Sequence, residues 1–184
     1  MQPAGDEAVA KRFPLRKRSW LLACGALAAC AVAIYFLAAG FFFTQGRPAP
    51  AVAFTGLLGE TISAETLRGK VVIVNFWSPT CVDCIKEMPT MVDAYEKFHG
   101  RGLEFVAVAM SYDAPNEVAG FVRSRKLPFK IAHDVSGNAA SAFGHVRQTP
   151  TTFVIDRHNQ VIKRYVGVPD IPAFHRLLEK ALAV

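Results

Sequence analysis

The chain has 184 residues and a formal net charge of +6, from 21 Lys and Arg against 15 Asp and Glu. Five of the basic and two of the acidic residues lie within residues 1–18, so half of the net charge belongs to the N-terminus. The rest of the chain has no Lys/Arg cluster with interleaved aromatic residues, and this excludes nucleic acid as an expected partner.

A long uncharged segment follows the basic N-terminus. Residues 21–43 contain no charged side chain, and as a helix they would extend about 34 Å, enough to cross a hydrocarbon core of roughly 30 Å. Only Arg47 follows before the folded domain, so the positive-inside rule places the N-terminus in the cytoplasm. We therefore expect a cytoplasmic N-terminus at residues 1–19, a transmembrane signal anchor at 20–43 and a linker at 44–53.

Two alternatives to an uncleaved anchor stay open. Residues 27–30, Leu-Ala-Ala-Cys, are similar to a lipobox in which Cys30 would carry the lipid, although the residues after it stay apolar. A cleaved signal peptide would prefer a shorter apolar core and a small-x-small site, for which residues 37–39 are a poor match. Each alternative exports residues 54–184, so we expect this domain in the periplasm at the bacterial inner membrane.

Strand and helix signals alternate along the exported domain, after a glycine-containing stretch at 54–70 that predicts a small strand pair. The expected strands are residues 71–76, 103–110, 129–132, 151–156 and 161–166, the last two forming a hairpin. The expected helices are residues 81–98, 115–125, 136–143 and 170–182, with Ser136 as the cap of the third. This order predicts an α/β domain with a mixed central sheet flanked by helices.

Cys81 and Cys84 lie where a β-branched apolar strand hands over to a helix. A helix N-terminus stabilises a thiolate through its free N–H groups and its dipole, so we expect the pKa of Cys81 below the free value of about 8.5. Cys81 should then attack, and the more buried Cys84 should resolve the mixed disulfide. An inert disulfide is the alternative, whereas a structural zinc site would need two further ligands at suitable spacing.

Two motifs in this domain resemble one known family. Residues 74–89, Val-Asn-Phe-Trp-Ser-Pro-Thr-Cys-Val-Asp-Cys-Ile-Lys-Glu-Met-Pro, are similar to the active-site region of membrane-anchored, thioredoxin-like proteins of the TlpA/ResA kind. Residues 149–156, Thr-Pro-Thr-Thr-Phe-Val-Ile-Asp, are similar to the proline loop of the same family. The resemblance covers residues 48–184. It implies a thioredoxin-like fold, thiol:disulfide oxidoreductase activity and a redox-active Cys81–Cys84 disulfide, with no metal or other cofactor.

The resemblance also implies roles for four further residues. Glu87, one helical turn after the second cysteine, is expected to relay protons and modulate the dithiol, because Asn75 stands where thioredoxins carry an ionisable aspartate; a solvated surface acid is the alternative. Pro150 is expected in cis, with Thr149 offering backbone groups to an extended client segment. Trp77 is expected to cover one side of the dithiol and contact the substrate, with an ordinary core aromatic as the alternative.

The expected function is that of a membrane-anchored periplasmic thiol:disulfide oxidoreductase that reduces client proteins. Asp83, between the cysteines, favours a reducing dithiol because its negative charge destabilises the thiolate. The sequence has no flavin or nicotinamide motif, so the electrons would come from a transmembrane thiol donor. The family implies apocytochrome c cysteines awaiting haem, or oxidised metal-site thiols, as clients.

Two other functions stay open. A peroxiredoxin-like peroxidase would resemble the motif Pro-x-x-x-Thr/Ser-x-x-Cys, in which Ser78 fits the hydroxyl position but Val74 occupies that of the proline. A Sco-type copper metallochaperone would space its cysteines one residue further apart and add a distant histidine. A peroxide-consumption assay and a copper titration separate these alternatives from the oxidoreductase.

Overall fold

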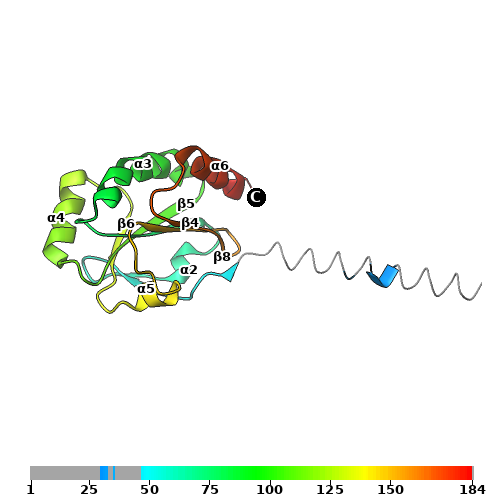
Figure 1. The fold of residues 1–184 in the computed structure, drawn as a ribbon, viewed down its shortest axis with the longest axis horizontal. Helices are drawn as coiled ribbons and strands as arrows, with labels where there is room; N and C mark the ends of the chain where they lie inside the picture. Colours follow the sequence, from blue (N-terminus) through cyan, green and yellow to red (C-terminus); the bar gives the residue numbers. More distant parts are fainter. Residues whose placement is uncertain (1–29, 33–34, 36–46, 184) are drawn as a thin grey trace, which may run out of the picture. The chain divides into compact units, whose positions relative to one another are not determined.

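The computed structural model describes residues 30–32, 35 and 47–183 (Figure 1). Most of the predicted segments 1–19 and 20–43 lies outside these residues, and so does the first part of the predicted linker. Among the described residues, no helix has the length and apolarity that crossing a membrane requires.

A mixed sheet forms the centre of the domain, with its six strands in the order β1-β8-β7-β4-β5-β6. Strands β4, β5 and β6 are parallel, whereas β7 is antiparallel to β4, β8 to β7 and β1 to β8. A second, two-stranded sheet pairs β2 with β3, as the glycine-containing stretch predicted. The strands are β1 Arg47–Pro48, β2 Phe54–Thr55, β3 Thr61–Ile62, β4 Val71–Trp77, β5 Leu103–Ala109, β6 Lys130–His133, β7 Thr151–Ile155 and β8 Gln160–Val166. The predicted mixed sheet and C-terminal hairpin are confirmed.

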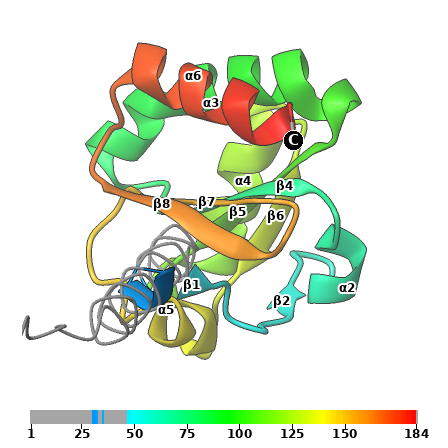
Figure 2. The ribbon, with the colours of Figure 1, turned by 90° about the vertical axis from the view of Figure 1, so that its right-hand side faces the viewer.

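Helices cover both faces of this sheet (Figure 2). On one face lie α3 (Val82–Phe98), α4 (Pro115–Arg125) and α6 (Ile171–Leu182), and on the other lie the short helices α2 (Ala64–Leu67) and α5 (Asn138–Ala142). A 3-10 turn, η1 (His99–Arg101), follows α3. All seven residues of β4 are buried because alternate side chains enter the two cores, Ile73 and Trp77 on the α3 side and Val74 and Phe76 on the α5 side.

The start of the domain differs from the expectation. Residues 47–49 were expected in the linker, but Arg47 and Pro48 form β1 at the edge of the sheet, and Ala49 extends the contact by one hydrogen bond. Arg47 pairs with Val161, and the N–H of Ala49 donates to the carbonyl of Asn159 at 2.8 Å. The pairing covers part of the β8 edge, whose free backbone groups would otherwise face solvent.

The cap of α5 also differs from the expectation. Ser136 was predicted as the cap of a helix at 136–143, but α5 is shorter, and the Ser136 hydroxyl accepts only from the N–H of Asn138, at 3.4 Å. Asp134 satisfies the next two N–H groups. The two carboxylate oxygens of Asp134 accept from the N–H groups of Ala139 and Ala140 at 3.0 and 2.8 Å. A carboxylate can satisfy two free donors of a helix start, where a hydroxyl satisfies one.

Candidate active site

Cys81 was predicted as the first residue of the helix. It is instead the N-cap of α3, which begins one residue later at Val82. Its Sγ accepts a hydrogen bond from the backbone N–H of Cys84 at 3.2 Å, and its own N–H donates to the carbonyl of Ser78 at 3.2 Å. The Cys81 side chain is partly exposed, whereas Cys84 is fully buried, and both are free thiols. The sulfur that can reach a client is therefore the one at the helix N-terminus.

The environment of Cys84 disfavours its thiolate. Burial raises the pKa of Cys84 most, and the hydrogen bond and charge of Cys81 raise it further. Hydrogen bonds from the Ser78 backbone and from Thr149 act in the opposite direction, but they are outweighed. Cys84 thus keeps its proton while Cys81 reacts, as a resolving thiol should.

The proline loop lies against the dithiol, as the resemblance implied. The Thr149–Pro150 peptide is cis, and the thiol of Cys81 donates to the carbonyl of Thr149 across 3.4 Å. The register of the sheet explains the approach, because Phe76, just before the dithiol turn, pairs with Thr151, just after the proline. Both motifs of the sequence therefore meet at one end of β4.

Glu87 is buried beneath the dithiol turn, so the alternative of a solvated surface acid does not hold. Only 2 % of Glu87 is exposed, and its Oε1 accepts from Nδ2 of Asn75 at 2.9 Å. The same amide nitrogen lies 2.9 Å from Oγ1 of Thr152. Burial raises the pKa of Glu87 to about 7; the Asn75 hydrogen bond lowers it, and the charge of Asp83 raises it. A carboxyl group that titrates near neutrality can both give and take a proton.

Trp77 has no exposed surface, so in this conformation it cannot contact a client. Its ring packs 5.1 Å from that of Phe121 on α4, within the core on the α3 side. This placement agrees with the alternative interpretation, an ordinary core aromatic at the end of a buried strand.

Sequence reasoning missed Asp113 and Thr152. Asp113 lies in the loop after β5, and its Oδ1 accepts from the hydroxyl of Ser78 at 2.7 Å. A signal was available, because Ser78 and Asp113 both follow the carboxyl ends of strands, and such ends meet at one edge of a parallel sheet. Thr152 offered no such signal, since it reaches Asn75 only through the antiparallel pairing of β7 with β4.

Comparisons with known proteins cover most of the domain. The AhpC/TSA family model matches residues 45–164. The thiol-disulfide oxidoreductase ResA of Bacillus thuringiensis subsp. konkukian is 33 % identical over 152 residues, which cover 80 % of this chain and 83 % of that protein. ResA of Halalkalibacterium halodurans is 33 % identical over 158 residues, or 83 % of this chain and 88 % of that protein.

Solved structures show the same likeness. A thiol:disulfide interchange protein of the thioredoxin family from Chlorobium tepidum superposes with a TM-score of 0.68 at 28 % identity, covering 75 % of this chain and 97 % of that one. StoA from Bacillus subtilis superposes with a TM-score of 0.59 at 25 % identity, covering 70 % and 98 %.

Proposed function

Because this chain belongs to the AhpC/TSA family and, within it, to the TlpA/ResA-like thiol:disulfide oxidoreductases, we propose that it is a membrane-anchored reductase of client proteins in the periplasm. Cys81 attacks one sulfur of a client disulfide, and a client thiolate leaves. Cys84 then loses its proton and attacks the Cys81 sulfur, which releases the second client thiolate. The client disulfide is thereby reduced by two electrons, and Cys81 and Cys84 are oxidised to a disulfide.

The environment of Cys84 is the main observation that supports a reductase rather than an oxidase of client thiols. Burial raises its pKa, and no cation is among the groups that act on it. Asp83 and Glu87, on the same helix, are acidic. Within the described part of the chain, the only base that forms an ion pair with either is Lys86, 4.0 Å from exposed Asp83. A dithiol whose thiolates are poorly stabilised is easily oxidised, and so it acts as a reductant.

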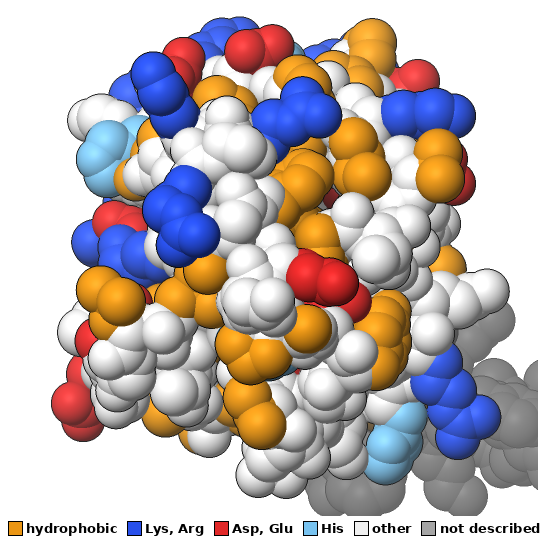
Figure 3. All heavy atoms as spheres, turned by 90° about the vertical axis from the view of Figure 1, so that its left-hand side faces the viewer, with side chains coloured by type: hydrophobic (Ala, Val, Ile, Leu, Met, Phe, Trp, Pro, Cys, Tyr) orange, Lys and Arg blue, Asp and Glu red, His pale blue; other side chains and the backbone are white. Residues whose placement is uncertain are grey.

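Exposed apolar side chains around the dithiol support a protein client. The exposed fraction is 63 % for Val82, 64 % for Tyr112 and 49 % for Val168. The hydroxyl of Tyr112 interacts with Thr149, and the N–H of Gly167 donates to the carbonyl of Pro150 at 2.8 Å, so both segments border the proline loop. Figure 3 shows hydrophobic side chains across the face that lies on the α4 side of the molecule. Such side chains favour contact with a polypeptide.

The rest of the proposal concerns the chain's surroundings. Residues 20–43 anchor the protein in the inner membrane, and the basic N-terminus keeps the domain on the periplasmic side. A transmembrane thiol donor re-reduces the Cys81–Cys84 disulfide, which needs no further cofactor. Clients are proteins whose cysteines must be reduced before they take up haem or a metal ion.

The reduction potential of the full-length protein in detergent tests the direction. The redox state of Cys81 and Cys84 is read by alkylation and peptide mapping, which separates them from Cys24 and Cys30. We expect a value nearer that of thioredoxin, about −270 mV, than that of a strong oxidant, about −120 mV. A potential above roughly −180 mV, that of protein disulfide isomerase, would overturn the reducing role.

Trapping experiments test whether Cys81 is the attacking thiol and Cys84 the resolving thiol. Cys84→Ser should accumulate mixed disulfides with clients, and Cys81→Ser should abolish exchange. Faster alkylation of Cys84 than of Cys81 in the reduced protein would contradict the assignment. Rapid consumption of peroxide would support the peroxidase instead, and tight copper binding by the reduced protein would support the copper chaperone.

A further inference from the structure

Asp113 is a buried carboxylate that has no role in the exchange reaction as described above. It is 7 % exposed, and its two oxygens accept hydrogen bonds from two donors. Oδ1 accepts from the hydroxyl of Ser78 at 2.7 Å, and Oδ2 accepts from the N–H of Met110 at 3.2 Å. Among the described residues, no Lys, Arg or His forms an ion pair with it. A buried carboxylate without a cation is costly, so its hydrogen bonds must hold it in place.

Asp113 determines the direction of a short chain of hydroxyl groups. The Ser78 hydroxyl also lies 2.9 Å from Oγ1 of Thr80 and 3.2 Å from the N–H of Thr80. The Ser78 hydroxyl has one proton, and it donates this proton to Oδ1 of Asp113. The hydroxyl of Thr80 must then donate to Ser78. The hydroxyl and the N–H of Thr80 therefore both donate to the Ser78 hydroxyl, which alone links the turn before Cys81 to the carboxylate.

Ser78 touches both cysteines through its backbone. Its carbonyl accepts from the N–H of Cys81 at 3.2 Å. Burial raises the pKa of Cys84, and a hydrogen bond from the Ser78 backbone opposes this by stabilising the thiolate. The side chain of Ser78 is tied to Asp113, so any shift of that carboxylate changes where these backbone groups lie.

We propose that Asp113 is a positioning residue that holds Ser78 in place and thereby sets how fast Cys84 resolves the mixed disulfide on Cys81. In this step Cys84 gives up its proton, the Cys84–Cys81 bond forms, and the bond from Cys81 to the client sulfur breaks. The client sulfur leaves with the electron pair and takes up the proton. The proposal deepens the exchange activity described above and needs neither a particular client nor a membrane.

Asp113→Asn is the informative change because it keeps the shape and removes one acceptor. The site needs two acceptors, one for the Ser78 hydroxyl and one for the N–H of Met110, whereas an amide offers one acceptor and one NH₂ donor. In this variant, either the N–H of Met110 faces the NH₂ donor of the amide, or the Ser78 hydroxyl has to turn so that it accepts from this NH₂ group. Ser78→Ala breaks the same contact from the other side with a smaller change, and it covers the case in which Asp113→Asn fails to fold.

Asp134→Asn provides a matched control. Asp134 is also 7 % exposed, also follows a strand of the sheet, and also accepts two hydrogen bonds, but it caps α5 on the opposite face. Neither of its partners is near the dithiol turn. Its loss should lower stability without changing the reaction of the cysteines.

The experiment measures resolution without a client. In full-length protein with Cys24 and Cys30 changed to alanine, a chromogenic aromatic disulfide forms a mixed disulfide with Cys81, and release of the second thiolate reports the attack by Cys84. The rate is followed from pH 5 to 10 for the parent, the three single variants and the Asp113→Asn/Ser78→Ala pair. Apart from Asp113 itself, the titratable groups around the turn are unchanged in every variant: Cys81, Cys84, Asp83, Glu87 and Tyr112.

We expect Asp113→Asn and Ser78→Ala each to slow resolution by about 2- to 10-fold at neutral pH, the range for one lost hydrogen bond. Both should move the pH midpoint of release upward, and the pair should be no slower than the slower single variant, because the two changes break one contact. A profile like that of the parent, or of Asp134→Asn, would show that Asp113 is merely structural. Fully multiplicative effects in the pair would also overturn the proposal. Because release needs no donor or client, these outcomes do not depend on the reducing direction.

Discussion

Glu87 shows at the scale of one residue how the fold changes the chemistry of a side chain. Burial lifts its pKa from 4.5 to about 7, and the amide of Asn75 fixes one of its oxygens. The folded state therefore holds a proton between those pH values that the unfolded chain has lost. The sign follows directly: the protein should lose stability as pH rises from 4.5 to 7, by at most about 3 kcal/mol.

Glu87→Gln should remove this pH dependence. At pH 5, where Glu87 is protonated, the variant should be within about 1 kcal/mol of the parent, since the amide has the same shape. Above pH 7 it should be the more stable of the two. It should also shift the pH dependence of thiol alkylation at the dithiol, because a neighbouring carboxylate changes the energy of a thiolate. Urea unfolding and alkylation at several pH values measure both effects.

Glu96→Gln, at an exposed position of the same helix, is the control, and identical profiles for the two variants would contradict a proton-relay role.

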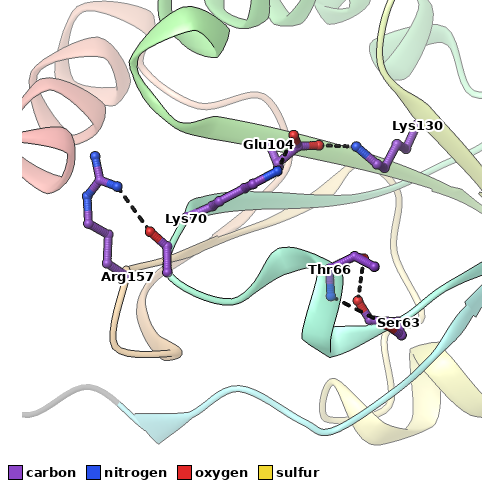
Figure 4. Close-up of polar contacts among 7 residues, drawn as sticks. Ser63, Thr66, Lys70, Glu104, Lys130 and Arg157 are labelled. Atoms are coloured by element: carbon purple, nitrogen blue, oxygen red, sulfur yellow. Dashed lines mark hydrogen bonds and ion pairs between the residues drawn. The ribbon is translucent and has the colours of Figure 1, made fainter.

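At the scale of elements, an ion network joins the N-terminal ends of three parallel strands (Figure 4). Glu104 on β5 is 5 % exposed, and Lys70 beside β4 and Lys130 on β6 both donate to its carboxylate, Lys70 at 2.9 Å. Burial alone would raise the pKa of Glu104, but the hydrogen bonds and charges of Lys130 and Lys70 outweigh it and lower the pKa. The network therefore contributes its full stability above the ordinary value of 4.5 and loses it as pH falls through the lowered pKa.

Glu104→Gln should thus destabilise the protein at neutral pH but not in acid. We expect a loss of about 1–3 kcal/mol at pH 7, the range for hydrogen bonds to a charged group, and a difference that shrinks towards pH 3. Denaturant unfolding at pH 3, 5 and 7 provides the comparison. A loss that is the same at every pH would mean that packing, and not charge, holds this corner of the sheet.

Arg157, which Figure 4 also labels, links the ends of three elements. Its guanidinium donates to the carbonyls of Gly69 at 3.0 Å, Arg101 at 3.2 Å and Leu182 at 3.5 Å. Gly102 makes room for it, because a Cβ at that position would lie 3.1 Å from Nη1, and the glycine has a φ of +94°. The side chain thus ties the end of α6 to the starts of β4 and β5.

Arg157→Met should cost about 2–4 kcal/mol of unfolding free energy, because it leaves carbonyl groups without donors. Arg157→Lys should recover only part of this, since an ammonium is a single point and not a planar fork. Neither variant should change the reduction potential, because the dithiol lies at the other end of β4. Thermal unfolding and redox titration of both variants check the two halves of this prediction, and a changed potential would count against it.

At the scale of the whole molecule, charge asymmetry around residues 21–43 predicts the topology. Five basic residues precede this segment and only Arg47 follows it before the domain. An alkaline phosphatase fused after Val184 should therefore be active, because that reporter folds only after export, and a cytoplasmic reporter at the same place should be silent. The opposite pattern would place the domain in the cytoplasm and remove the proposed clients. Replacing the five basic residues by glutamine should weaken the preference.

The order of elements, the position of the dithiol and the helix that presents it could be predicted from the sequence alone. The physical reason is that these features depend on local signals: a β-branched run, an amphipathic period and a proline in a first helical turn. Each signal involves only residues that are close together in the sequence. Cys81 at a helix start follows from such local signals, and so does the 115–125 helix, whose bounds agree with those of α4. The burial of Glu87 could not be read in the same way, because its position on α3 admits either a solvated or a buried side chain.

Contacts between distant residues were decided only by the tertiary structure. Asp113 meets Ser78 across 35 positions and Asn75 meets Thr152 across 77, because the parallel and antiparallel neighbours of β4 bring their ends together. Trp77 lost its expected contact with substrate because α4 covers it, and Asp134 joined Ser136 at the start of α5 because its two oxygens satisfy two further donors. Local patterns contain no information on the order of strands in the sheet. The sequence by itself therefore determined which chemistry this protein carries, and the packing of the sheet decided which side chains hold and tune it.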